Sequence, residues 1–156
     1  MNPGIVSLLG YFYFLPLLLS WITSLMFKKD SPLLSLAILY MGILGFVLVH
    51  IFFIDKYIEY LYYDGLVPIA YLAVYYLFKH RIPMLKELGA IIYGVIADHV
   101  GGSLGASITY PSIVGLISLW KYVAYIYPIE RTILILIGAI ILLPVLKPWR
   151  KFYQSQ

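Results

Sequence analysis

Residues 94–111 read GVIADHVGGSLGASITYP, and the way this stretch folds decides how many times the chain crosses a membrane. It places Asp98 and His99 side by side in an apolar run and follows them with three glycines. Glycine weakens a helix by roughly 1 kcal/mol relative to alanine. The stretch therefore predicts either a broken, re-entrant segment or a helix whose small residues pack against a neighbour.

The composition fixes the class of protein. Hydrophobic residues make up 63% of the chain and charged residues 12%, whereas a soluble domain carries roughly 25% charged residues. A span needs ~20 apolar residues, so the 156 residues predict an all-α, polytopic membrane bundle of five or six spans. We expect a single transmembrane domain over residues 1–156. The absence of cysteine excludes disulfides, iron–sulfur clusters and covalently attached haem.

Six apolar segments are bounded by charged or turn-forming residues such as KKDSP and YYDG. The predicted spans are Ile5–Phe27, Pro32–Ile54, Glu59–Phe78, Leu88–Ile108, Ser112–Tyr127 and Thr132–Leu146. Lysine and arginine concentrate in the loops at 28–30 and 79–87, which predicts that these loops are cytoplasmic and that the N-terminus lies outside. We expect a prokaryotic plasma membrane as the location.

The basic C-terminal residues 147–151 conflict with six crossings, which would put them outside. One solution is that region 88–128 crosses once, through a broken or re-entrant segment. The other is a duplication, because KYIEYLY (56–62) resembles KYVAYIY (121–127) and YMGILGF (40–46) resembles YPSIVGL (110–116). Two three-helix halves would then be inverted relative to each other, a plan known in transporters.

Asp98 and His99 are the first candidates for a functional site. A charge near the bilayer centre costs at least ~2.5–3.5 kcal/mol, so such residues are usually paired, protonated or facing a cavity. One interpretation is an interhelical hydrogen-bond cluster with partners such as Ser107. The other is a proton or ligand site formed by Asp98, His99 and Ser103.

The glycines predict close helix packing rather than a phosphate site. Gly94, Gly101, Gly102 and Gly105 form a small-residue face of the kind that packs helices in lipid. No GxxxxGK pattern is present.

No zinc signature is present, and we expect no metal and no cofactor. A weaker hypothesis is a b-type haem. His50 and His99 lie on different predicted spans at similar depth, and two histidines can ligate one haem iron.

The chain resembles lycopene cyclase domains of the small, three-helix type over about 35 residues. The resemblance rests on Asp98, on Gly105 seven residues later, and on Pro128 and Glu130 of PIER, where Arg131 stands in place of a second glutamate. It implies an acid-catalysed ring closure of a polyene dissolved in the bilayer, with Asp98 and Glu130 as the acids.

Three functions are therefore open, and the sequence does not decide whether the protein is an enzyme. The first is a binding or packing subunit with a polar site at Asp98 and His99 for a proton or a small or lipidic ligand. The others are a carotenoid cyclase and a haem-carrying membrane anchor. The expected partners are the lipid bilayer and other membrane subunits or further copies of the chain, and no nucleic acid.

Overall fold

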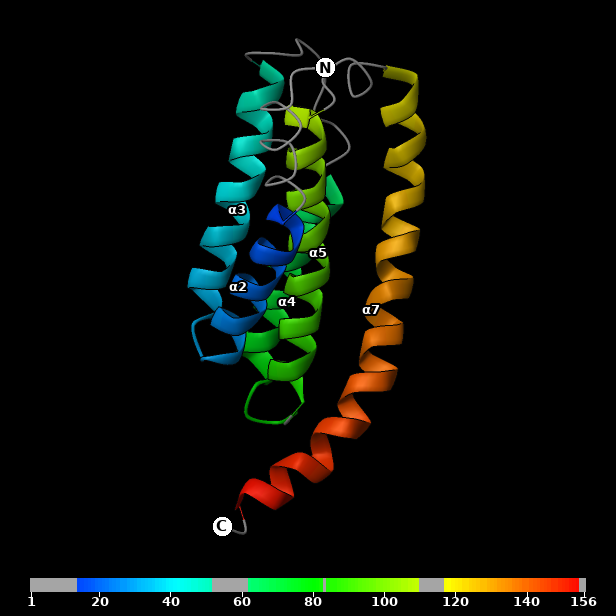
Figure 1. The fold of residues 1–156 in the computed structure, drawn as a ribbon. Helices are drawn as coiled ribbons and strands as arrows, with labels where there is room; N and C mark the ends of the chain where they lie inside the picture. The colour runs from blue at the N-terminus through cyan, green and yellow to red at the C-terminus, as the bar shows by residue number, and fades with distance from the viewer. Residues whose placement is uncertain (1–13, 52–61, 83, 110–116, 155–156) are drawn as a thin grey trace.

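The computed structural model describes residues 14–51, 62–82, 84–109 and 117–154, which form an all-α bundle (Figure 1). The helices are α2 (Leu15–Lys28), α3 (Pro32–Val49), α4 (Tyr62–Phe78), α5 (Leu85–Thr109) and α7 (Ile117–Gln154). Helices α2 to α5 run alternately up and down, and α7 returns along the outside of α5. The predicted helical bundle is confirmed.

α5 is the central helix, since it contacts each of the other four. Its glycines allow α2 to approach closely. A Cβ atom added to Gly94 would lie 2.3 Å from Ser24 Oγ, and one added to Gly101 would lie 2.8 Å from Pro16 Cα. At Gly101 the neighbour is backbone, so glycine is required there for the observed α2–α5 packing, whereas at Gly94 a side chain would force the Ser24 hydroxyl to move.

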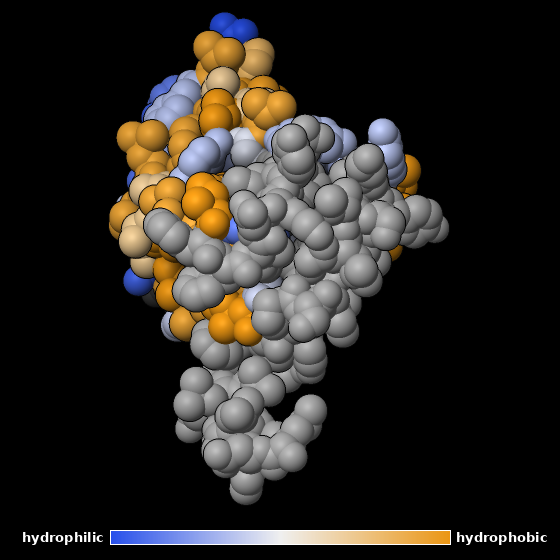
Figure 2. Space-filling view, turned by 90° about the horizontal axis from the view of Figure 1, so that it is seen from above, coloured by the Kyte–Doolittle hydropathy of each residue, from blue (hydrophilic) through white to orange (hydrophobic). Residues whose placement is uncertain are grey.

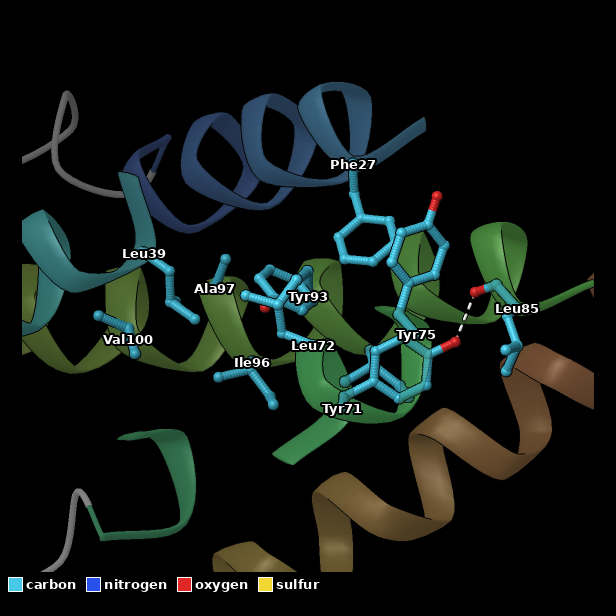
Figure 3. Packing of buried hydrophobic residues seen from close by; sticks show 11 residues of the cluster. Phe27, Leu39, Tyr71, Leu72, Tyr75, Leu85, Tyr93, Ile96, Ala97 and Val100 are labelled. Carbon is cyan, nitrogen blue, oxygen red and sulfur yellow. Dashed lines mark hydrogen bonds between the residues drawn. The ribbon is translucent and has the colours of Figure 1, made fainter. Parts of the chain in front are cut away.

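Aromatic side chains fill the core near the loop between α4 and α5 (Figure 3). The Phe27 ring lies 4.8–6.1 Å, centroid to centroid, from the rings of Tyr71, Tyr75 and Tyr93. The buried hydroxyls are satisfied by backbone acceptors: Tyr71 donates to the carbonyl of Leu85, and Tyr93 donates to a carbonyl of α4 at 2.9 Å. A buried tyrosine needs such a partner.

Of the two alternatives for GGSLGAS, the broken helix is wrong. α5 continues through Thr109 without interruption. The intrinsic cost of glycine is outweighed by the packing that the small residues permit, because four of the seven (Gly101, Ser103, Gly105 and Ser107) are buried. A re-entrant path over residues 110–116 lies outside the described residues.

The predicted break between two spans at residues 128–131 is also wrong. α7 is one helix of 38 residues that contains Pro128. Proline removes one backbone hydrogen bond from a helix, but lipid-embedded helices tolerate it where other groups compensate. Beyond Pro128, side-chain hydrogen bonds hold α7 to its neighbours: Arg131 donates to Asp98 of α5, and Thr132 Oγ1 lies 2.8 Å from Tyr63 Oη of α4. α7 bends in its last turns, where Pro144 and Pro148 lie (Figure 1).

The two predicted three-helix halves stay a prediction. The repeated blocks 56–62 and 110–116 lie outside the described residues, apart from Tyr62. The described segments contain five helices, and α7 replaces the two last predicted spans.

Within the described parts of the chain, three helical segments are long and apolar enough to cross a membrane: Pro32–Val49, Leu85–Ile108 and Tyr125–Val145. Most side chains of the last segment are exposed, as are the outward faces of α2 and α3. The view from above shows orange apolar side chains on the uncovered flank of the bundle (Figure 2). A surface of this kind is typical of an integral membrane protein.

The basic residues gather at one end of the bundle. The α2–α3 turn, the loop between α4 and α5 and the C-terminal part of α7 all lie at the end marked C in Figure 1. These segments hold eight of the 11 lysines and arginines: Lys28, Lys29, Lys79, Arg81, Lys86, Lys147, Arg150 and Lys151. Because α7 replaces two predicted spans, the charges of the C-terminus no longer conflict with those of the loops.

Candidate functional site

Two buried titratable side chains meet between α4 and α5. His99 Nδ1 lies 2.8 Å from Asp64 Oδ2, and the two side chains are only 4% and 1% exposed. Because a carboxylate can only accept, the imidazole donates from Nδ1. The pair joins residues that are 35 positions apart in the sequence.

The pair lies deep in the bundle. Asp64 is the third residue of α4, 14 residues before its last residue, Phe78. At ~1.5 Å per residue, the carboxyl group is roughly 21 Å from the basic end of that helix, well inside a hydrocarbon core of ~30 Å. Its place in the first turn also puts the carboxylate at the positive end of the α4 dipole, which favours an anion.

α7 covers the other side of His99. The ring of Tyr127 lies 4.1 Å from the imidazole, centroid to centroid, at an interplanar angle of 37°. The guanidinium of Arg131, one turn further along α7, lies 5.5 Å from the Tyr127 ring. Tyr127 is therefore held between an imidazole and a cation, an arrangement that its π-face favours.

Asp98 pairs with Arg131 rather than with its neighbour His99. Arg131 donates from one terminal nitrogen to Asp98 Oδ2 at 3.2 Å. The Arg131 side chain is 12% exposed and that of Asp98 is 42% exposed. Adjacent helix positions point about 100° apart, so Asp98 faces α7 while His99 reaches the Asp64 of α4. The Asp98 carboxylate is therefore neutralised by the Arg131 guanidinium.

Three buried polar atoms of this cluster have no hydrogen-bond partner among the described residues. They are Asp64 Oδ1, His99 Nε2 and Arg131 Nε. Buried polar groups are normally satisfied, and exceptions point to an ordered water, an ion or a functional role. Asp64 Oδ1 offers an acceptor. His99 Nε2 offers a lone pair when the ring is neutral and an N–H donor when it is protonated.

The cluster defines a site that can handle a proton or hold a hydroxyl or amine. An imidazole hydrogen-bonded to a carboxylate can gain and lose a proton at Nε2 while Nδ1 stays fixed. A second bond links the helices nearby, since Tyr63 Oη and Thr132 Oγ1 lie 2.8 Å apart between α4 and α7. The start of α4 is therefore bound to α5 through Asp64 and His99, and to α7 through Tyr63 and Thr132.

Ser103, the third residue of the predicted ligand site, is buried one turn beyond His99. Its backbone carbonyl accepts a hydrogen bond from Ser107 at 2.7 Å. That bond lies within α5 and joins no second helix. No side-chain hydrogen bond links Ser103 to the Asp64–His99 pair in the part of the chain that the structure describes.

The glycines predicted to pack helices lie on α5, in two different environments. Gly94 and Gly101 lie against α2, as described above. A Cβ atom added to Gly102 would meet Pro16 Cγ only at 3.9 Å, which is an ordinary contact. Gly105 is buried. Gly89, which the sequence analysis did not single out, packs so closely that a Cβ atom would lie 2.2 Å from the Phe27 ring.

The two acids of the predicted cyclase site lie beside the same guanidinium. Glu130 Oε1 is 3.9 Å from Arg131, and Asp98 is at 3.2 Å. Glu130 is 46% exposed. Both residues lie inside α7 rather than at a helix start, and the Arg131 side chain is 12% exposed.

The histidines of the haem hypothesis do not face each other. Gly42 and Gly45 of α3 lie level with Val100 and Leu104 of α5, so the two helices run parallel. On this register His50 lies about nine residues beyond His99, or roughly 13 Å along α5. No group of three or more histidine, cysteine or acidic side chains that could hold a metal occurs among the described residues.

Asp64 is the residue that the sequence analysis missed, because YYDG was taken as a turn. In the structure it starts the buried face of α4, which also includes Pro68, Tyr71, Leu72 and Tyr75. These positions are spaced three or four apart, the period of one helix face. That spacing is visible in the sequence and could have placed Asp64 in the core.

Comparison with protein-family models, with curated proteins and with solved structures found no match to this chain.

Proposed function

We propose that this protein is a small membrane-embedded binding subunit that holds a proton, or the polar end of a small or lipidic ligand, at the Asp64–His99 pair. The observation that carries this proposal is the 2.8 Å contact between two almost fully buried titratable groups, each with one polar atom left without a partner. Intramembrane acids and histidines are costly, and they commonly mark ion, proton or ligand sites.

The two atoms of the pair that lack a partner, Asp64 Oδ1 and His99 Nε2, suit a ligand that can both donate and accept a hydrogen bond. A hydroxyl group or a water molecule can donate to Asp64 Oδ1 and accept from, or donate to, His99 Nε2. Tyr127 closes the site from α7, and α7 packs mainly on α5. A ligand dissolved in the bilayer would therefore enter beside α7.

The proposed orientation follows from the charges. The end that carries eight of the 11 lysines and arginines faces the cytoplasm of a prokaryotic cell, and the N-terminus faces out. The exposed apolar side chains of α7 contact lipid or another membrane subunit.

The test is purification of the full chain in a mild detergent, followed by identification of bound small molecules by mass spectrometry. We expect a ligand, or a bound proton seen in the histidine side-chain NMR signals, that is retained by the wild type. Asp64→Asn keeps a hydrogen-bond acceptor for His99 but removes the titratable carboxyl group, and Asp64→Leu removes both. If the two variants lose the ligand or the proton signal while Asp64→Asn keeps the wild-type melting temperature, the site is functional. If Asp64→Asn changes neither signal, the pair only stabilises the fold.

A lipid-phase cyclase is the second candidate, because the structure brings Asp98 and Glu130 to one guanidinium. Against it, Asp98 accepts a hydrogen bond from Arg131, whereas an acid catalyst has to present a proton to the substrate. Conversion of an acyclic carotenoid by the purified protein would support the cyclase. The haem alternative requires a Soret band in the same preparation, and the separation of His50 from His99 argues against it.

A further inference from the structure

A second polar site, far from Asp64 and His99, lies at the basic end of the bundle. A cavity of about 520 Å³ opens between the α2–α3 turn, the end of α4 and the start of α5. Its size falls in the range of ~300–1,000 Å³ that is common for small-molecule sites. The side chains that line it include Tyr75, Tyr76, Lys79, His80, Lys86 and Asp30.

The cavity carries an excess of positive charge. Lys86 donates to Asp30 and is thereby neutralised. Lys79 lies 5.1 Å from the centroid of the Tyr76 ring, and it forms no ion pair among the described residues. Its ammonium group therefore keeps its hydrogen-bond donors free for an anion. Tyr75 and Tyr76 bring two hydroxyl groups to the same wall.

The backbone holds Asp30 at this cavity. Asp30 has a φ of 62°, and Ser31 donates to the Met26 carbonyl at 3.0 Å, so α2 ends in a Schellman-type turn. Pro32 then starts α3 and fixes the direction of the chain. The carboxylate of Asp30 consequently stays near Lys86 and competes with any anion for that lysine.

The surroundings identify the source of the anion. Ile82 lines the cavity and is itself 46% exposed. Apolar surface next to basic groups at the end of membrane helices is where phospholipid headgroups lie. We propose that this cavity binds the phosphate of an anionic phospholipid headgroup through Lys79, with the two tyrosine hydroxyls as further donors.

The probe is phosphatidylglycerol added to the purified full chain in detergent, with binding measured by native mass spectrometry. Phosphatidylcholine and inorganic phosphate are the comparison ligands. We expect phosphatidylglycerol to bind more tightly than phosphatidylcholine. Lys79→Gln should weaken its binding about fivefold, the effect of one basic residue at a membrane surface. Lys79→Arg should restore it.

Two further variants separate the cavity from the general charge of this end. Lys29→Gln removes the same charge from the same end of the bundle without lining the cavity, so it should change binding less than twofold. Asp30→Asn removes the competing carboxylate, and asparagine tolerates the positive φ, so binding should tighten. The three positions are at the surface, and melting temperatures without lipid check that each variant folds.

Equal losses in Lys79→Gln and Lys29→Gln would overturn the proposal, because binding would then reflect net charge alone. Equal affinity for phosphatidylglycerol and phosphatidylcholine would also overturn it. If inorganic phosphate binds with the same dependence on Lys79 and competes with the lipid, the lipid source is wrong and the cavity serves a soluble phosphate. None of these outcomes depends on the Asp64–His99 site.

Discussion

Gly101 shows how a single position sets the distance between two helices. Its Cα lies so close to α2 that an added Cβ would be 2.8 Å from the backbone of Pro16. The neighbouring Gly102 has room, with the nearest atom at 3.9 Å. Backbone atoms cannot move aside as the end of a flexible side chain can, so the two glycines differ in what they tolerate.

We predict that Gly101→Ala destabilises the protein by about 1–3 kcal/mol through overpacking. Gly102→Ala is the matched control and should be neutral or stabilising by up to ~1 kcal/mol, because alanine is the better helix former. The measurement is the free energy of unfolding in detergent. Equal effects of the two substitutions would show that α2 does not pack on Gly101 as described.

Asp98 and His99 could be recognised as candidates from the sequence because charged residues inside an apolar run stand out. Their partners could not be predicted. Asp64 was interpreted as part of a turn, and Arg131 was noted only because it stands where the cyclase family has a second glutamate. Which acid meets which base depends on the register between helices, and that register is set by glycine contacts such as those of Gly94 and Gly101. Sequence spacing alone carries no such information.

At the scale of helices, the least predictable feature was α7. Pro128 and the charged pair that follows it are ordinary boundary signals, yet the helix continues through them. The glycine-rich part of α5 likewise suggested a break in the helix, yet α5 continues through it. In both helices, side-chain hydrogen bonds and tertiary packing outweigh the local propensity on which the sequence prediction relied. The predicted start of α3 at Pro32 and the predicted end of α4 at Phe78 are confirmed, whereas the boundaries predicted at Ile5, Ile54, Glu59 and Ser112 lie outside the described residues.

The packing of α7 on α5 predicts a specific cross-link. A Cβ atom added to Gly138 would lie 3.1 Å from Ile91 Cγ2. The cysteine pair Ile91→Cys and Gly138→Cys should therefore form a disulfide on mild oxidation, and the natural chain has no cysteine to interfere.

The control pair is Ile91→Cys with Ile140→Cys, because Ile140 is 71% exposed and points away from α5. It should stay reduced under the same conditions. The cross-link is read from the masses of proteolytic fragments. Efficient cross-linking of the control pair and not of the Gly138 pair would show that α7 is rotated relative to this account.

For the whole molecule, one continuous α7 places three basic segments at the same end. We predict that single cysteines at Ser31, His80 and Gln154 are all labelled from the same side of the membrane, and that one at Ile117 is labelled from the other. Impermeant reagents added to intact cells and to inverted vesicles make the comparison. Labelling of Gln154 from the side opposite to Ser31 would mean that the chain crosses once more or once less than proposed.

The buried pair of Asp64 and His99 is the central claim, and a double-mutant cycle tests it most directly. The free energy of unfolding in detergent is measured for Asp64→Leu, for His99→Leu and for the double variant. A direct contact predicts a coupling energy of about 0.5–3 kcal/mol, with the double variant less destabilised than the sum of the single ones. The control cycle combines Asp64→Leu with Ser107→Ala, roughly 12 Å further along α5 than His99, and should be additive within ~0.5 kcal/mol. Additivity in the Asp64–His99 cycle would contradict the account.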